Sequence, residues 1–403
     1  MTAEIGILNR NAVVLAADSI STLTVAGKSK FISVNKLFAL SKHVGIMVYD
    51  NAYFTNIPWE LVIKVYTLFI KSITFDRLQE YCDGFLKFLI SEPRIYDPNY
   101  ENKLVESVFE YCLKELGIHI KSRQEPEMSI AKQIEEKLSY FSNLKFSDGF
   151  DENFIKSFIE KHQLHLKSYI NDMVNVSIDS KAQQNIILLC AYIISKSNFL
   201  INTMPSSGIV IAGFGSQEIF PSLNEYKIIG IISGKLIYQT KNSVKIYEAS
   251  NIPTNTFSTI MTFAQTEIVE TYTLGIDTDI KNAIFYDINN IFNNFYDNLL
   301  SEFDNASEHM FSDKEIDKIN AVGLKLKKQI EDSFTAVQFT KYVDPFRNMA
   351  GFLGKEEMAA LAESLVNLTS TRRRFTTDEE TVGGATDVAI ITNGEGFVWI
   401  KKK

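Results

Sequence analysis

Both ends of the chain carry the pattern of a β-hairpin, and this feature constrains the fold more than any other. At the start, the runs 3–8 and 12–17 flank a short turn that contains two asparagines. Near the end, the runs 387–392 and 397–400 flank an Asn-Gly turn. Strand-forming runs separated by such short turns predict antiparallel hairpins. We expect the two hairpins to pair in one sheet, which would tie both ends of the chain into the same core.

The middle of the chain has helical periodicity instead. Between residues 58 and 202, apolar residues recur every three or four positions, as at Leu104, Val108 and Cys112. Strands and helices are therefore segregated along the sequence, which favours an α+β fold over repeated βαβ units. Further strands are expected at 36–40, 44–49, 208–214 and 226–232, and further helices at 258–273, 280–300 and 354–368.

The second residue offers a specific chemistry. Thr2 follows the initiator Met1, and a side chain of this size allows the methionine to be removed. The free threonine would then carry its own general base, because its α-amino group can accept the hydroxyl proton. Many cytosolic chains begin with Met-Thr, so this feature needs support from the surrounding sequence.

Three ordered segments provide that support. The first runs from Thr2 through the acid Asp18, which follows the second strand, to Lys36, which opens an Asn-Lys-Leu-Phe string. The second is the strand 209–215 with the Pro-Ser-Leu string that follows it, and the third is the Gly-Gly-containing run 383–391. Together they cover about 140 residues and resemble the β-subunits of the proteasome.

The resemblance implies a divergent, bacterial-type N-terminal-nucleophile (Ntn) hydrolase with a four-layer αββα sandwich. In that family Thr2 would be the nucleophile, Lys36 would lower the pKa of its amine, and Asp18 would pair with the lysine. Lys28 and Lys30 are alternatives for the lysine. The proteasome-like core would comprise 1–57 and 203–403, and residues 58–202 would form a mostly helical segment made of core helices and an insertion. The implied activity is hydrolysis of peptide or other amide bonds, without a cofactor.

The chain also departs from the family pattern. The glycine whose backbone N–H serves the oxyanion falls near Tyr49 or Asp50, where a larger or charged side chain would narrow the pocket or repel an oxyanion. About 150 residues replace two helices of the family. Two other functions therefore stay open: an Ntn-type amidase acting on small amides, and an inactive scaffold that binds a partner through its helical insertion.

The remaining expectations concern partners and location. The resemblance implies a homo-oligomer, and any ATP-driven unfoldase would be a separate protein because the chain has no phosphate-binding loop. A net charge of -8 disfavours nucleic acid, and three scattered cysteines fit a reducing cytoplasm without a disulfide framework. The longest apolar run, 186–194, is too short to cross a membrane. His162 and His165 lack further ligands at a convincing spacing, so we expect an exposed polar helix face and no metal site.

Overall fold

The computed structural model describes residues 3–25, 28–71, 73–115, 127–173, 179–196, 199–246, 257–265, 267–306, 312–375 and 383–403. The fold is of the α+β class, as the segregation of strands and helices predicted. The chain forms two compact units. The first comprises residues 1–33, 246–390 and 399–403, and the second comprises 34–245 and 391–398. In this division the helices of 58–202 are grouped with a sheet in the second unit.

The first unit is built on a five-stranded sheet in the order β12-β1-β2-β13-β14. Both terminal hairpins belong to it, which confirms that the two ends of the chain enter one sheet. The antiparallel pairing of β1 with β2 places Glu4 opposite Ala17 and Leu8 opposite Val13. The strands are β1 (Ala3–Asn9), β2 (Ala12–Asp18), β12 (Ser258–Ala264), β13 (Thr386–Thr392) and β14 (Gly396–Lys401).

The sequence-based helix at 258–273 is wrong for its first half. Residues Ser258–Ala264 form β12, which pairs with β1 along its whole length, from Asn9 opposite Ser258 to Ala3 opposite Ala264. The helix α8 (Glu267–Leu274) begins only after this strand. Long-range pairing decides the conformation here, since local propensity is weak against the ladder that β1 offers.

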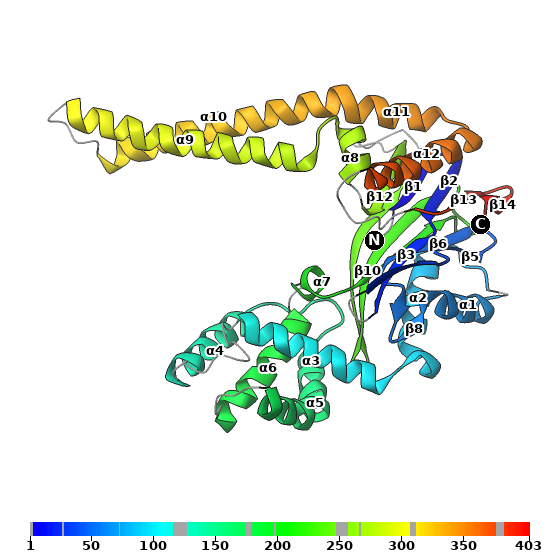
Figure 1. Cartoon of the computed structure of the whole chain (residues 1–403), viewed down its shortest axis with the longest axis horizontal. Helices are drawn as coiled ribbons and strands as arrows, with labels where there is room; N and C mark the ends of the chain where they lie inside the picture. Colours follow the sequence, from blue (N-terminus) through cyan, green and yellow to red (C-terminus); the bar gives the residue numbers. More distant parts are fainter. Residues whose placement is uncertain are drawn as a thin grey trace. The chain divides into compact units, whose positions relative to one another are not determined.

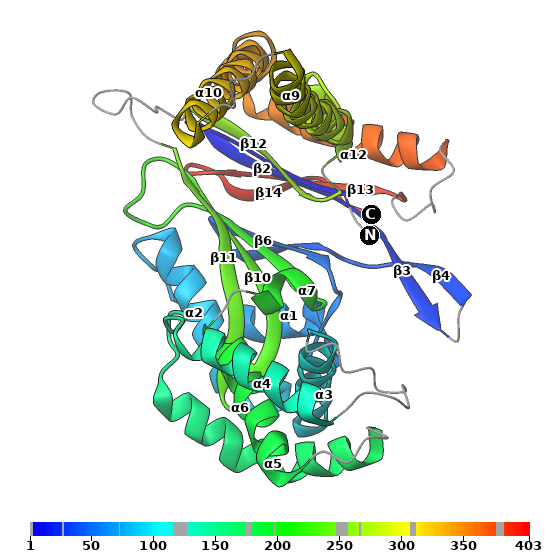
Figure 2. The same ribbon diagram turned by 90° about the vertical axis from the view of Figure 1, so that its left-hand side faces the viewer.

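Helices cover one face of this sheet (Figure 2). The helix α12 (Lys355–Arg374) buries Met358, Ala362 and Val366, which recur at helical spacing and face the apolar residues of β1 and β2. The small side chains let the helix lie close to the strands. The other helical elements of the unit are α9 (Thr278–Ala306), α10 (Asp313–Gln338), a π-helical turn (Phe339–Val343) and α11 (Asp344–Phe352).

The second unit contains another five-stranded antiparallel sheet, in the order β11-β10-β9-β6-β5. The helices α1 (Trp59–Phe69) and α2 (Leu78–Ser91) pack on it through an aromatic core that includes Trp59, Tyr66 and Phe85. The strands are β5 (Leu37–Ser41), β6 (Val44–Asp50), β9 (Ser207–Gly213), β10 (Ser222–Ile232) and β11 (Lys235–Lys245).

Further helices complete the second unit (Figure 1). They share an apolar core that includes Phe109, Phe158 and Ile186. The helical character expected for 58–202 is therefore present. Among all described residues of the chain, no helix is long and apolar enough to cross a membrane. These helices are α3 (Pro98–Glu115), α4 (Glu127–Ser142), α5 (Glu152–Met173), α6 (Ser180–Lys196) and α7 (Phe199–Thr203), with a 3-10 turn at Pro93–Ile95.

Two small hairpins were not predicted. The first consists of β3 (Ile20–Val25) and β4 (Lys28–Ser33), and the second of β7 (Tyr53–Phe54) and β8 (Ile57–Pro58). The hairpin β3–β4 lies in the stretch between Asp18 and Lys36 that the sequence left without structure. It contains both Lys28 and Lys30, whose side chains lie outside the description.

Candidate active site at the start of the chain

Asp18 ends β2 and holds the start of β1. Its side chain is buried, with 1% of the residue exposed. One carboxylate oxygen accepts a hydrogen bond from the backbone N–H of Ala3 at 2.9 Å. The antiparallel register explains this contact, because pairing of Glu4 with Ala17 brings residue 18 opposite residue 3. Thr2, the predicted nucleophile, directly precedes Ala3 in the chain and lies outside the described residues.

A second contact of the Asp18 carboxylate involves the glycine pair Gly383-Gly384. The second carboxylate oxygen accepts a hydrogen bond from the N–H of Gly383 at 3.2 Å. Gly384 has a φ of +80°, and a Cβ atom there would lie 2.7 Å from the hydroxyl oxygen of Ser19. Only glycine combines this conformation with so close an approach. The Gly-Gly string therefore has a definite task, which is to bring a backbone donor to Asp18.

This role of Gly383 was not predicted. Its string was recognised by resemblance, while its partner is 365 positions away in the sequence. The signal that pointed to it was the pair of adjacent glycines before a strand, which indicates a place where the backbone approaches another chain segment closely.

Lys36 belongs to the second unit. It directly precedes β5 and is 4% exposed. Its backbone carbonyl accepts a hydrogen bond from the N–H of Val48 at 2.9 Å, so its main chain is anchored in the sheet. A buried ammonium group requires polar partners. The burial of Lys36 is therefore consistent with a specific role for this side chain. Its relation to Thr2 and Asp18 stays a prediction.

Tyr49 and Asp50, which the sequence placed near the oxyanion position, have partners within the second unit. The hydroxyl of Tyr49 donates a hydrogen bond to the carboxylate of Glu225. Asp50 has a φ of +65° and forms an ion pair with Lys227. A cation beside Asp50 offsets the negative charge that was expected to repel an oxyanion.

The expectation of an exposed polar face is wrong for His162. This residue is 1% exposed, and its Nε2 lies 2.9 Å from a carboxylate oxygen of Glu101. His165 pairs with Glu106 at 2.8 Å. His162 can be buried because a carboxylate on α3 satisfies the hydrogen bonding of its ring. The spacing of residues within α5 cannot reveal a partner on another helix. Among the described residues, no group of three His, Cys, Asp or Glu side chains could hold a metal ion.

Glu101 is the centre of a buried polar network. It also accepts hydrogen bonds from the ammonium of Lys161 at 2.8 Å, from Tyr96 at 2.5 Å and from the N–H of Ser233 at 2.8 Å. Burial alone would raise the pKa of Glu101, but the hydrogen bonds from His162, Lys161, Tyr96 and Ser233 outweigh it and lower this pKa to about 2. The network joins α3, α5 and the turn between β10 and β11, and we assign it a structural role.

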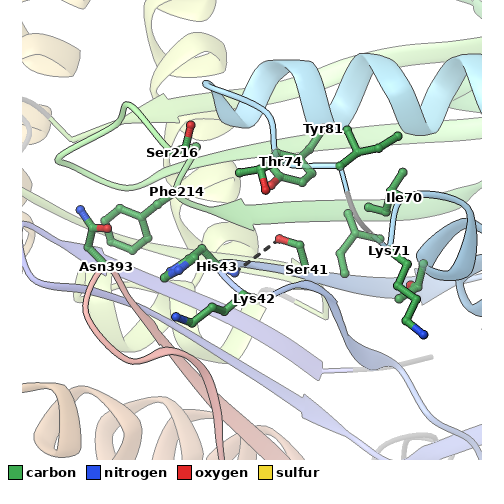
Figure 3. Close-up of a pocket in the computed structure, with 14 residues that line it drawn as sticks. Ser41, Lys42, His43, Ile70, Lys71, Thr74, Tyr81, Phe214, Ser216 and Asn393 are labelled. Atoms are coloured by element: carbon green, nitrogen blue, oxygen red, sulfur yellow. Dashed lines mark hydrogen bonds between the residues drawn. The ribbon is translucent and has the colours of Figure 1, made fainter.

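A pocket of about 470 Å³ lies within the second unit (Figure 3). The β5–β6 turn, the end of α1 and the segment after β9 form its walls, and its lining includes Ser41, His43 and Ser216. The His43 imidazole Nδ1 lies 3.3 Å from the carbonyl oxygen of Thr392. The volume suits a small molecule. Lys36, the predicted catalytic lysine, belongs to the same unit and does not line this pocket.

Comparison with known proteins returned no match, either to a protein-family model or to a curated protein.

Proposed function

We propose that this chain is an N-terminal-nucleophile hydrolase that cleaves peptide or other amide bonds with Thr2. The observation that carries the proposal is the hydrogen bond from Ala3 N–H to the Asp18 carboxylate. It joins the predicted acid to the residue that directly follows the predicted nucleophile.

The architecture of each unit supports the same proposal. Each contains one five-stranded sheet with helices packed on a face, α8 and α12 in the first unit, α1 and α2 in the second. A four-layer αββα sandwich consists of two such halves. We propose that the two units are these halves.

The chemistry follows from the N-terminal threonine. The neutral α-amine takes the proton of the Thr2 hydroxyl while the oxygen attacks the carbonyl carbon of the amide. The protonated amine then gives that proton to the leaving nitrogen as the C–N bond breaks, and an ester on Thr2 remains. Water, deprotonated by the same amine, hydrolyses the ester and restores the hydroxyl. Lys36 would favour the neutral amine by its charge, and Asp18 would keep the lysine protonated.

The first test is the mass of the purified protein together with covalent labelling. We expect loss of Met1 and addition of one molecule of a threonine-directed electrophile, such as an epoxyketone or a β-lactone. Thr2→Ala should abolish labelling, whereas Thr2→Ser should retain it because the hydroxyl is kept. Thr271→Ala serves as the matched control, since Thr271 lies on α8 and its hydroxyl donates to the backbone carbonyl of Glu267 in the same helix.

The second test concerns the lysine. Lys36→Ala should abolish labelling and amide cleavage while the protein stays folded, as measured by circular dichroism. If mature protein with a free Thr2 takes no label, the enzymatic proposal is wrong and the scaffold function remains. Cleavage of small amides but not of peptides would identify the amidase.

A further inference from the structure

Two cysteines from different helices meet in the core of the second unit. Cys112 belongs to α3 and Cys190 to α6, and their sulfur atoms lie 3.3 Å apart. The two residues are 78 positions apart in the sequence, so their spacing along the chain does not reveal this contact. The proposed hydrolase chemistry uses neither of them.

The packing of the two helices holds the sulfur atoms in place. Cys112 follows Phe109 on the buried stripe of α3, and Cys190 lies between Ile186 and Ile193 on the buried stripe of α6. Both cysteines are 0% exposed and belong to the same apolar core. Side chains in such a core are close-packed. The two sulfur atoms therefore stay near each other as long as α3 and α6 remain packed together.

The distance between the two sulfur atoms is close to what a disulfide bond needs. An S–S bond is about 2.05 Å long, so the sulfur atoms of Cys112 and Cys190 must approach each other by roughly 1.3 Å. Rotation about the two Cα–Cβ bonds moves sulfur atoms over distances of this order. The bond can therefore form while the fold of the unit is kept.

The third cysteine of the chain lies in a different core. Cys82, on α2, belongs to the aromatic core that covers the sheet of the second unit, and the side-chain amide of Asn224 donates to its sulfur at 3.4 Å. All three cysteines are described and buried, and Cys112 and Cys190 are the two that share a core. Cys82 is therefore an internal control, a buried thiol without a second cysteine in its core.

We propose that Cys112 and Cys190 form a modification site, which a peroxide oxidises to an intramolecular disulfide. The thiolate of one cysteine attacks an oxygen of hydrogen peroxide, the O–O bond breaks, and a sulfenic acid and water are formed. The sulfur of the other cysteine then attacks the sulfenic sulfur, the S–S bond forms, and the hydroxyl leaves as water. The two thiols give up two protons and two electrons, which reduce the peroxide to two molecules of water.

The disulfide joins α3 to α6 and closes a loop that contains α4 and α5, both of which pack against α6. A cross-link that closes a long loop restricts the unfolded chain, so the oxidised helices resist unfolding better than the reduced ones. Because both thiols are buried, peroxide reaches them when α6 opens locally from α3, and oxidation is slower than that of an exposed thiol. Thr2 takes no part in this reaction, so disulfide formation and electrophile labelling can fail separately.

The test counts the thiols of the full chain after treatment of the folded protein with hydrogen peroxide. Reduced protein that is unfolded and alkylated should take three alkyl groups, one for each cysteine. Peroxide-treated protein should lose alkylation at Cys112 and Cys190, and peptide mapping without reductant should find these two residues joined within one chain. A reductant should restore both thiols. Two unprotected thiols at these positions, oxidation without a cross-link, or a bond between two chains would overturn the proposal.

A second readout is the midpoint of thermal unfolding. Oxidation should raise the midpoint of wild type by at least about 5 °C, and a reductant should reverse the rise. Cys82→Ala is the matched control and should show the same rise, whereas Cys112→Ala should show none, although its methionines meet the same peroxide. If Cys112→Ala does not fold, Cys190→Ala takes its place. Equal shifts in wild type and Cys112→Ala would overturn the proposed link between α3 and α6.

Discussion

Removing the charge of Asp18 should both destabilise the start of β1 and reduce the reactivity of Thr2. In Asp18→Asn one side-chain oxygen can still accept a hydrogen bond, but the new NH2 group faces a backbone N–H. One of the two bonds, to Ala3 or to Gly383, is then lost, and a buried donor stays unsatisfied. Hydrogen bonds to charged groups contribute about 1.5–3 kcal/mol, so we expect the free energy of unfolding to fall by roughly 2–4 kcal/mol.

The assay combines urea unfolding with hydrogen exchange. The unfolding midpoint at pH 7 should fall in Asp18→Asn, and the amides in peptides covering 3–9 and 383–390 should exchange faster than in wild type. Asp172→Asn is the matched control, because Asp172 is exposed on α5 and should change stability by less than about 0.5 kcal/mol. Labelling of Thr2 by the electrophile should slow at least tenfold under conditions in which the variant is folded.

Two outcomes would refute this reasoning. Equal midpoints for Asp18→Asn and Asp172→Asn, with unchanged exchange near Ala3 and Gly383, would mean that the two hydrogen bonds do not hold the strands. Reduced stability with a normal rate of Thr2 labelling would leave Asp18 with a structural role only.

Two further predictions concern the second unit. The pKa of Glu101 is about 2 in the folded chain and ordinarily 4.5, so its contribution is present above pH 4.5 and is lost as the pH falls toward 2. Glu101→Gln should therefore lower the free energy of unfolding by about 3 kcal/mol at pH 7. The stability of this variant should fall less than that of wild type between pH 4.5 and 2. Parallel curves of stability against pH for the two proteins in that window would contradict the lowered pKa of Glu101. Gly208→Ala should cost at least about 2 kcal/mol, because the new Cβ would lie 2.0 Å from the Tyr49 ring, and Tyr49→Leu in the same chain should recover part of the loss in a thermal unfolding assay. No recovery in the double variant would mean that the crowding involves other groups.

Local sequence was sufficient for the elements whose signals are local. The terminal hairpins follow from strand-forming runs around short turns, and the helices of 58–202 follow from apolar residues at helical spacing. Asp18 and Thr2 were selected by resemblance and by the chemistry of an N-terminal threonine. For Asp18 the structure adds its partners, Ala3 and Gly383.

Elements whose conformation depends on distant partners could not be predicted in this way. β12 was taken for a helix, because nothing within 258–264 reveals that β1 lies free to pair with it. His162 was expected on an exposed face, and only its contact with Glu101 of another helix explains its burial. On α9 and α10, likewise, only the contacts of Lys281 with Gln338 and of Phe285 with Phe334 show which sides of the two helices face each other.

The sequence by itself determined the α+β class, the terminal hairpins and the identity of the candidate nucleophile and acid, because these depend on short-range patterning and on the chemistry of single residues. Only the tertiary structure decided which strand lies beside β1, and that Asp18 accepts hydrogen bonds from both Ala3 and Gly383. The physical reason is that the pairing of β1 with β12 and the hydrogen bond between Asp18 and Gly383 join residues hundreds of positions apart. Their energy comes from burial and hydrogen bonding that exist only once the chain has folded.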